Sequence, residues 1–435
     1  MRTKFFPINL ECYVIIEKMS TKKPADKPAK KPDREDAEAP LDDYCETVGL
    51  MEPMCVGEDS RLRGELSELA FELGTKSARF KAMLPQESVA SLAELVRAMN
   101  CYYSNLIEGH NTHPIDIERA LKGDYSNNPE TRDLQLEAKA HINVQRWLDS
   151  GVLNERLTEP DAVRQIHKRF CEELPDSLLR VTDPKTGASE RVVPGEYRRG
   201  HVQVGAHIPV SPGAVPRFMV RFNDAYRRLR RSERVIATAG AHHRLLWIHP
   251  FADGNGRVAR LMSHAMLVEA LDTGALWSVA RGLARNSERY KSHLAACDQG
   301  RRNELDGRGT LSEETLASFS KFFLEVCMDQ VDFMEGLMQP KTFRDRVLRW
   351  VNNEIDAGDL PKRAGVIVDA VLHRGALPRA ELEPLLGVAD RTARRIASAL
   401  LERGVLKAET HKADLKLAFT VGIAKEWMPD LFPEA

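Results

Sequence analysis

Residues 249–260 read His-Pro-Phe-Ala-Asp-Gly-Asn-Gly-Arg-Val-Ala-Arg. Pro250 lacks a backbone N–H and disfavours helix at the preceding residue, so a helix is expected to end at His249. The two glycines tolerate positive φ, and such a run can turn successive N–H groups inward as an anion nest. From Arg257 to Arg260 a new helix is expected, whose first N–H groups and positive dipole end favour phosphate. The stretch therefore predicts a loop between two helices that holds a phosphorylated ligand beside an imidazole.

The charged side chains of this loop fit the same ligand. Arg257 and Arg260 lie three residues apart, on one helical face, and guanidinium groups grip phosphate oxygens bidentately. Asp253 supplies an anionic oxygen of the kind that Mg²⁺ takes when it bridges phosphates. We therefore interpret the loop as catalytic.

Three other interpretations of the loop fit its residues less well. Residues 254–259 match the dinucleotide-binding fingerprint, but that fingerprint follows a strand, and residues 235–248 are apolar at helical spacing. The start of the loop also resembles a calcium-binding loop, but Arg257 and Val258 stand where a ligand and the obligatory glycine belong. A plain capped turn between two helices would explain the glycines, but not the pre-proline histidine or the paired arginines.

The twelve residues resemble, without a mismatch, the signature of the Fic family, HxFx[D/E]GNGRxxR. The resemblance implies a mainly α-helical core with a short β-hairpin flap. It also implies an enzyme that transfers AMP from ATP to a Ser, Thr or Tyr hydroxyl of a target protein, and to itself. In that enzyme His249 would be the general base and Asp253 would hold Mg²⁺. The phosphate contacts would come from Gly254, Asn255, Gly256, Arg257 and Arg260. The intact Gly-Asn-Gly favours AMP over the phosphoryl or phosphocholine groups that some relatives transfer.

Composition sets limits on the rest of the chain. At 435 residues two or three domains are expected. Lys+Arg 63 against Asp+Glu 64 leaves a net charge of -1, so no overall field favours nucleic acid. The 7 cysteines form no CxxC pair, which indicates reduced thiols rather than a disulfide framework or structural zinc. No apolar run reaches the roughly 18 residues of a membrane span. A cytoplasmic protein without a membrane contact is expected.

The N-terminal part is expected to contain two regions. Residues 1–45 are predicted to be a disordered tail, because residues 19–40 are rich in Lys, Pro, Asp and Ala. A short β-prone patch at residues 13–16 lies within this tail, and Met19 is an alternative start. Residues 46–150 are predicted to be a helical region, with amphipathic helices at residues 60–73, 88–107 and 134–148.

Glu108 lies at the end of the second of these helices, with Gly109 as its left-handed C-cap. A carboxylate there opposes the helix dipole, at a cost of about 0.3–1 kcal/mol unless a cation compensates. Residues 104–109 resemble the Fic inhibitory motif, [S/T]xxxE[G/N], in which Ser104 and Glu108 share a face. The resemblance implies that Glu108 reaches Arg260 and excludes the γ-phosphate of ATP, so that the enzyme is autoinhibited. An ordinary surface glutamate at a helix end is the other interpretation.

Residues 151–340 are predicted to be the catalytic core. Helices are expected at residues 161–174, 212–231, 234–248, 260–271, 287–297 and 319–338. His167 is expected to pack between helices. Between residues 191 and 209, β-branched residues alternate with glycines, which predicts a short hairpin. The Fic resemblance implies that this hairpin is a flap that holds the target by main-chain pairing, although an ordinary connection would look the same.

The expected helix at residues 287–297 carries Tyr290 and Leu294 on one face. By resemblance to the Fic family these two side chains line the adenine slot. Lys291 stands where many relatives have a second tyrosine, so this assignment rests on fewer matches than the phosphate site.

Residues 341–425 resemble a winged helix-turn-helix domain. Helices are expected at residues 341–356, 366–373, 379–386 and 390–403, followed by a hairpin within 405–419. The last helix would present Arg391, Arg394 and Arg395 to DNA or to a protein partner, and the sequence favours neither.

Alternatives to an AMP-transferring enzyme stay open at this point. The chain could be a DNA-binding transcriptional regulator with the Fic core as a sensor, or a toxin-like growth inhibitor. It could also act chiefly as a de-AMPylase, with Glu108 orienting a water molecule. The sequence does not encode the target protein, and it is compatible with a homo-oligomer.

Overall fold

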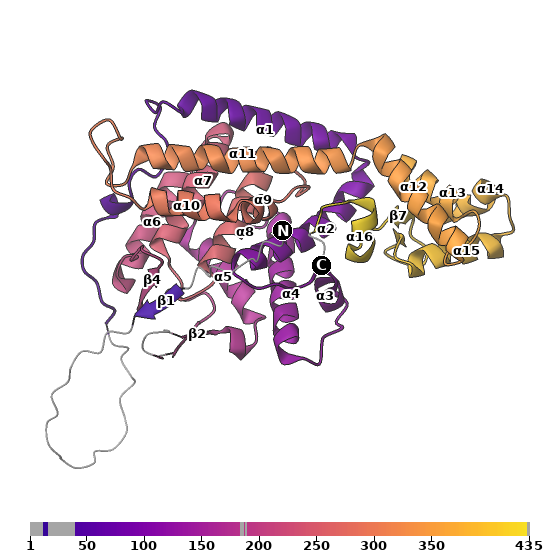
Figure 1. Cartoon of the computed structure of the whole chain (residues 1–435), viewed down its shortest axis with the longest axis horizontal. Coiled ribbons are helices and arrows are strands. Elements are labelled where there is room, and N and C mark those ends of the chain that lie inside the picture. The colour runs from indigo at the N-terminus through magenta and orange to yellow at the C-terminus, as the bar shows by residue number, and fades with distance from the viewer. Residues whose placement is uncertain (1–11, 16–39, 183–186, 188, 433–435) are drawn as a thin grey trace, which may run out of the picture.

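The computed structural model describes residues 12–15, 40–182, 187 and 189–432 (Figure 1). Most of these residues are helical. The α-helices are α1 (Arg63–Met83), α2 (Gln86–Ile107), α3 (Pro114–Leu121), α4 (Pro129–Asp149), α5 (Pro160–Glu172), α6 (Val215–Tyr226), α7 (Arg231–Ile248), α8 (Asn255–Leu271), α9 (Val279–Arg285), α10 (Ser287–Cys297), α11 (Glu313–Leu337), α12 (Pro340–Ala357), α13 (Ala364–Arg374), α14 (Leu382–Leu386), α15 (Asp390–Glu402) and α16 (Val421–Trp427).

Short 3-10 turns and strands connect these helices. The 3-10 turns are η1 (Val48–Met51), η2 (Asp176–Leu178), η3 (Pro212–Ala214) and η4 (Arg379–Glu381). The strands are β1 (Cys12–Ile15), β2 (Arg180–Thr182), β3 (Ser189–Arg191), β4 (His201–Val204), β5 (Ala376–Leu377), β6 (Leu406–Lys407) and β7 (Leu415–Leu417). The chain is therefore mainly α-helical, as expected.

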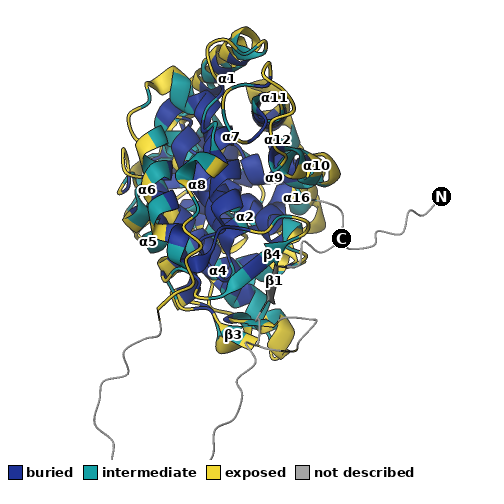
Figure 2. Ribbon diagram, turned by 90° about the vertical axis from the view of Figure 1, so that its left-hand side faces the viewer, coloured by how far each residue is buried: buried dark blue, intermediate teal, exposed yellow. Residues whose placement is uncertain are grey.

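Helix α7 lies at the centre of the core. Val235 and Ala239 pack in one apolar cluster with α1, α2, α9 and α11, whereas Ala241 and Leu245 pack in another with α4, α5, α6 and α8. Small residues let neighbouring helices approach α7 on all sides, and Figure 2 shows α7, α8 and α2 as mostly buried. Because both clusters hold α7, the loop that follows it is fixed from two directions.

The loop takes the backbone conformation that its sequence predicts. Helix α7 ends at Ile248, and His249 has left-handed backbone angles, φ 50° and ψ 61°. Gly254 also has positive φ, 82°, and α8 begins at the next residue. The helix after the loop thus starts two residues before Arg257, and its first turn includes Gly256.

The expected reversal of the chain within residues 191–209 is present, because Val204 and His207 form an antiparallel bridge across a two-residue turn. A second antiparallel pair, which was not expected, joins β2 and β3 upstream of it. Within residues 191–209 only β4 is a strand, and its partner is β1, with Cys12 opposite Val204 and Ile15 opposite His201. Local β-propensity identified β4 but could not identify its partner, because strand pairing is a tertiary property.

Parts of the predicted tail belong to the fold. Residues 12–15 form β1. Farther along, Asp43 bonds to Arg217, and the carboxylate of Glu46 accepts from the N–H and the hydroxyl of Ser211, both at 2.7 Å. Residues 1–11 and 16–39 of the predicted tail lie outside the described residues.

The C-terminal part contains α12 to α16 and a three-stranded antiparallel sheet in the order β5-β7-β6. The four predicted helices, now α12 to α15, and the predicted β6–β7 hairpin are present. Helix α16 was not predicted; it contacts α12 and α3, so the boundary placed at residue 425 falls inside a helix. The assignment of residues 341–425 as a winged helix-turn-helix domain stays a prediction.

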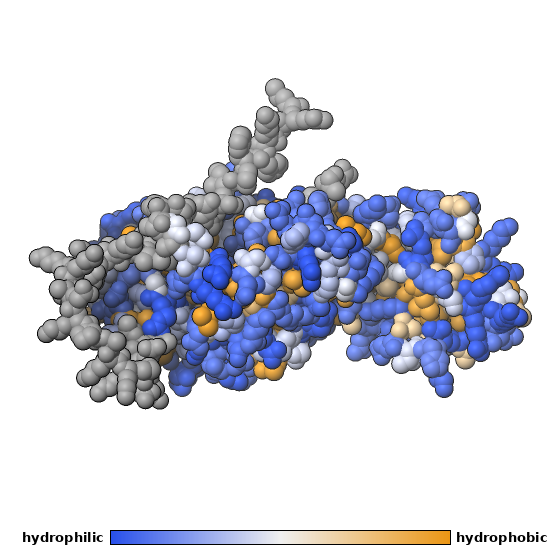
Figure 3. Space-filling model, turned by 90° about the horizontal axis from the view of Figure 1, so that it is seen from below, coloured by the Kyte–Doolittle hydropathy of each residue, from blue (hydrophilic) through white to orange (hydrophobic). Residues whose placement is uncertain are grey.

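The surface of the molecule is mixed. Figure 3 shows a mostly hydrophilic face, with apolar residues gathered most densely at the right, where Figure 1 places α12 to α15. Arg391, Arg394 and Arg395 are exposed on α15, and Arg394 bonds to Asp390 at 2.9 Å. Among the described residues, every helix is too short or too polar to cross a bilayer.

Candidate active site

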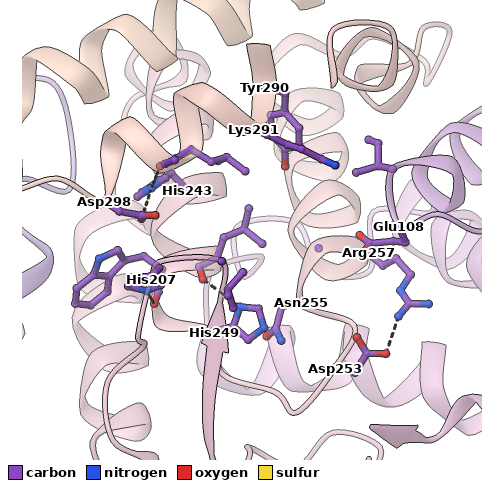
Figure 4. Close-up of a pocket in the computed structure, with 18 of the residues that line it drawn as sticks. Glu108, His207, His243, His249, Asp253, Asn255, Arg257, Tyr290, Lys291 and Asp298 are labelled. Atoms are coloured by element: carbon purple, nitrogen blue, oxygen red, sulfur yellow. Dashed lines mark hydrogen bonds and ion pairs between the residues drawn. The ribbon is translucent and has the colours of Figure 1, made fainter. Parts of the chain in front are cut away.

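A pocket of about 880 Å³ opens over the loop between α7 and α8 (Figure 4). Nine of the residues that the sequence singled out line its wall: Glu108, His249, Asp253, Asn255, Gly256, Arg257, Arg260, Tyr290 and Leu294. Gly254 and Ser104 do not line it. In Figure 4, Glu108, Arg257 and Asp253 lie on one side of His249, and His207 and His243 lie on the other. The tertiary structure therefore brings together residues from three separate parts of the chain.

His249 lies at the C-terminal end of α7, with 4% of its surface exposed. Its Nδ1 lies 3.3 Å from the carbonyl oxygen of Leu246. A proton on Nδ1 satisfies that carbonyl, which makes Nε2 the basic nitrogen. Burial lowers the pKa of His249 to about 3, and the charge of Arg198 acts in the same direction. The imidazole is therefore neutral at physiological pH and can accept a proton.

Two residues hold the loop backbone in shape. The side-chain amide of Asn255 accepts from the N–H of Phe251 at 3.0 Å and donates to its carbonyl at 2.9 Å. The ring of His167 stacks on the ring of Phe251, with centroids 3.8 Å apart. His167 Nδ1 accepts from the N–H of Gly195, so its Nε2 donates to the Asp253 carbonyl at 3.2 Å. The side chain of Asn255 thus braces the loop, and its expected contact with phosphate stays a prediction.

Arg257 is held by two carboxylates. One of its terminal nitrogens bonds to Glu137, and the other bonds to Asp253 at 2.9 Å. Glu137 is fully buried, and its second oxygen meets His110 Nδ1 at 2.7 Å. This hydrogen bond raises the pKa of His110. The guanidinium of Arg257 also lies over the ring of Phe170, 5.0 Å from its centroid. These contacts fix the direction in which Arg257 faces the pocket.

Arg260 is bound by the residues of the predicted inhibitory motif. Its Nε donates to the Ser104 hydroxyl at 2.9 Å, and Nη2 donates to the Ser104 carbonyl at 3.2 Å and to the Glu108 carboxylate. Burial raises the pKa of Glu108, but the charges of Arg260 and Arg257 lower it by a larger amount. The pKa of Glu108 therefore lies below its ordinary value. Glu108 is therefore ionised and occupies the cationic end of the pocket.

Tyr290 and Leu294 form another part of the wall, on α10. The Tyr290 hydroxyl lies 2.7 Å from His242 Nε2, and His242 Nδ1 lies 2.9 Å from the Ser263 hydroxyl. Ser263 in turn donates to the carbonyl of Ala259 in α8. This chain of hydrogen bonds turns the hydroxyl of Tyr290 into the core and leaves the ring for the pocket. Lys291 lines the pocket next to it.

Several residues that build the site were missed in the sequence. Glu137 lies on α4 beside its apolar stripe, so a carboxylate on a buried helix face was the available signal. Arg198 gave no such signal. It donates from its backbone N–H to the Pro250 carbonyl at 2.9 Å and from Nε to the His249 carbonyl at 2.8 Å. Only the tertiary contact shows that Arg198 supports the loop.

One group that the resemblance implies is Mg²⁺. Among the described residues, no cluster of three or more His, Cys, Asp or Glu side chains could hold a metal ion. A magnesium ion bound mainly through nucleotide phosphates needs only one or two protein carboxylates. Asp253 is a carboxylate on the pocket wall beside the first turn of α8, so this donor set fits such an ion.

Comparisons with known proteins agree with this site. The Fic/DOC family model matches residues 157–267, which include the whole loop. The protein adenylyltransferase Fic of Nematostella vectensis is 28% identical over 177 residues, 39% of this chain and 37% of the relative. The Culex quinquefasciatus protein of the same name is 40% identical over 174 residues, 39% of this chain and 31% of the relative. The chain thus spans only about a third of the length of these relatives.

A solved structure agrees in fold. The crystal structure of a Fic family protein from Desulfovibrio desulfuricans G20 superposes with a TM-score of 0.50 at 17% identity. The superposition covers 84% of this chain and 98% of that chain. The family match includes the six signature residues on the wall of the pocket, and it shows that residues 157–267 of this chain are a Fic/DOC domain.

Proposed function

We propose that this protein is a protein adenylyltransferase that moves AMP from ATP to a Ser, Thr or Tyr hydroxyl of a target protein. One observation carries the proposal. The pocket brings the neutral imidazole of His249 to the same wall as the first turn of α8, Arg257 and Arg260. The name of the two relatives described above, protein adenylyltransferase Fic, supports the same activity.

In this mechanism the phosphates lie over the N-terminus of α8. The N–H groups of its first turn have no acceptor within the helix and face the pocket with a positive dipole end. Gly256 keeps this surface open, because it has no side chain between the helix and the ligand. Arg257 would stabilise charge on the phosphates, as a preorganised cation does in a water-poor site. When bound, Mg²⁺ held by Asp253 would neutralise charge on the α- and β-phosphates.

His249 would act as the general base. The hydroxyl oxygen of the target forms a bond to the α-phosphorus, and the bond from that phosphorus to the bridging oxygen breaks, so that pyrophosphate leaves. The hydroxyl proton passes to Nε2 of His249. A bound triphosphate would add negative charge beside the imidazole and raise its pKa.

Glu108 would restrain this reaction. Its carboxylate is paired with Arg260, the cation that we assign to the γ-phosphate. A γ-phosphate cannot share the site with an ionised carboxylate, because like charges in a buried pocket repel strongly. ATP would bind productively only after Glu108 moves away, so the resting enzyme is autoinhibited.

The test uses ATP labelled on the α-phosphate. The Glu108→Gly variant should transfer label to itself and to proteins of a host lysate, and adding His249→Ala should abolish transfer while leaving ATP binding measurable by calorimetry. If Glu108→Gly binds ATP with magnesium but transfers no AMP, the proposed activity is wrong. If label is instead removed from pre-labelled protein, the site acts as a de-AMPylase.

A further inference from the structure

Strand β4 leads directly to the rim of the pocket. Its last residue, Val204, lines the pocket together with Gly205, Ala206 and His207. Val204 exchanges both backbone hydrogen bonds with His207, at 2.9 and 3.0 Å, across a two-residue turn. The edge of β4 that faces away from His207 is where an extended segment could add as a strand beside the site.

This edge is occupied by the chain itself. Residues 12–15 pair with it in antiparallel register, from Cys12 opposite Val204 to Ile15 opposite His201. The N–H and the carbonyl of Val204 are both hydrogen bonded to His207. The pair of Cys12 and Val204 is therefore a non-hydrogen-bonded pair of the ladder. Alternation along the ladder then makes Tyr13 with Gln203 a hydrogen-bonded pair.

Residues 42–44 are anchored near the first residue of β4, His201. The ring of Tyr44 stacks on the ring of His201, with centroids 5.3 Å apart. The Asp42 carbonyl accepts from the N–H of Gly213 at 2.8 Å. Arg217 holds the Asp43 carboxylate through two nitrogens, at 2.6 and 2.7 Å. Ile15 and Tyr44 thus both meet His201, one by main-chain pairing and one by ring stacking.

This anchor gives β1 an advantage over any segment from solution. Because β1 belongs to the same chain as the anchored residues 42–44, it is present at the edge of β4 at an effective concentration on the order of millimolar. A target that needs the same edge must displace β1, whatever the position of Glu108. The two elements act at different places, because Glu108 faces the phosphates and β1 lies along the rim.

We propose that residues 12–15 are an intramolecular occupant of the strand edge on which a target docks, and that they restrain the enzyme separately from Glu108. This proposal rests on the proposed AMP transfer for its consequence. The docking of β1 itself involves no nucleotide, and it can be tested without one.

The register supplies the first test. A non-hydrogen-bonded antiparallel pair has its Cα atoms about 4.5 Å apart, within the range of a disulfide. In a Cys45→Ser background, Val204→Cys should form a disulfide with the native Cys12 under mild oxidation, seen by peptide mass mapping. Gln203→Cys is the matched control, because neighbouring residues of a strand point to opposite faces and it should not cross-link. Equal cross-linking in both variants, or none with Val204→Cys, overturns the proposal.

The second test separates docking from catalysis. Tyr13→Pro removes an N–H that the ladder uses, whereas Val14→Pro removes one that points away from β4. A labelled peptide with the sequence of residues 9–18 should bind the full-length Tyr13→Pro variant with at least tenfold higher affinity than the wild type. Val14→Pro should behave as the wild type does. Equal peptide binding by all three proteins overturns the proposal.

The consequence for activity is measured last. In the Glu108→Gly background, the oxidised Val204→Cys protein should transfer AMP to lysate proteins several-fold more slowly than the reduced protein. Equal rates would show that β1 docks without restraining the enzyme, which overturns that part of the proposal. If no variant transfers AMP while the cross-link and the peptide binding behave as expected, the proposed function fails and the docking of β1 stands.

Discussion

The Oε1 atom of Glu108 lies 2.3 Å from the position that a Cβ atom on Gly256 would take. The carboxylate at the end of α2 therefore rests against the bare backbone of the first turn of α8, where we place the phosphates. A negative charge at a helix N-terminus is favourable, and the ion pair with Arg260 adds to it. Glu108 thus takes both the dipole and the cation that a γ-phosphate would use.

Removing this carboxylate should activate the enzyme. Glu108→Gly is expected to raise the rate of AMP transfer about tenfold or more, since a restraint worth about 1.4 kcal/mol corresponds to a factor of ten. Glu108→Gln keeps the size of the side chain without its charge, so it should give a smaller increase. The rates are measured with labelled ATP. A Glu108→Gly rate at or below the wild-type rate would refute the inhibitory role.

Gly256 and Glu108 should show energetic coupling. A methyl group at Gly256 would collide with Glu108 Oε1, so Gly256→Ala should cost about 1–3 kcal/mol of unfolding free energy in the wild type. In the Glu108→Gly background the same change should be neutral or slightly stabilising, because alanine is the better helix former. Urea unfolding of the four proteins measures this cycle. Additive free energies would show that Glu108 does not rest on Gly256.

The buried carboxylate of Glu137 should be essential for stability. Its oxygens pair with Arg257 and His110, so Glu137→Gln leaves Arg257 hydrogen bonded to only one carboxylate, that of Asp253. Breaking a buried ion pair on one side typically costs about 3–5 kcal/mol. The exposed Glu130 of the same helix is the control, and Glu130→Gln should change the unfolding free energy by less than about 0.5 kcal/mol. Equal effects of the two variants would contradict the pairing.

His141 should destabilise the protein in acid. It is buried, neither ring nitrogen has a hydrogen-bond partner among the described residues, and burial lowers its pKa to about 3. The unfolded chain, with a pKa near 6.5, binds the proton more tightly. The contribution of neutral His141 to stability is therefore complete above about pH 6.5 and is lost as the pH falls toward 3.

His141→Leu should remove this dependence. Between pH 8 and pH 5 the wild type should lose on the order of 2 kcal/mol more unfolding free energy than the variant. His411 is exposed, and His411→Gln should follow the wild type. Urea unfolding at the two pH values provides the measurement, and parallel losses in wild type and His141→Leu would contradict the assignment.

Local sequence was enough to predict the loop at the centre of the site. Pro250 ends one helix, Gly254 takes the positive φ that the turn needs, and the next helix follows at once. These effects act within a few residues, so they can be recognised without knowing the fold. The positions of most core helices followed from apolar spacing for the same reason.

What the sequence could not determine was decided by contacts between distant parts of the chain. Glu137, His167 and Arg198 hold the loop from other elements, and the sequence around them does not show that they contact it. The partner of β4 was also undetermined, since a strand edge accepts any extended segment and only the tertiary fold brings Cys12–Ile15 to it. Sequence thus determined the chemistry of the loop, whereas long-range packing decided what braces it and what covers its rim.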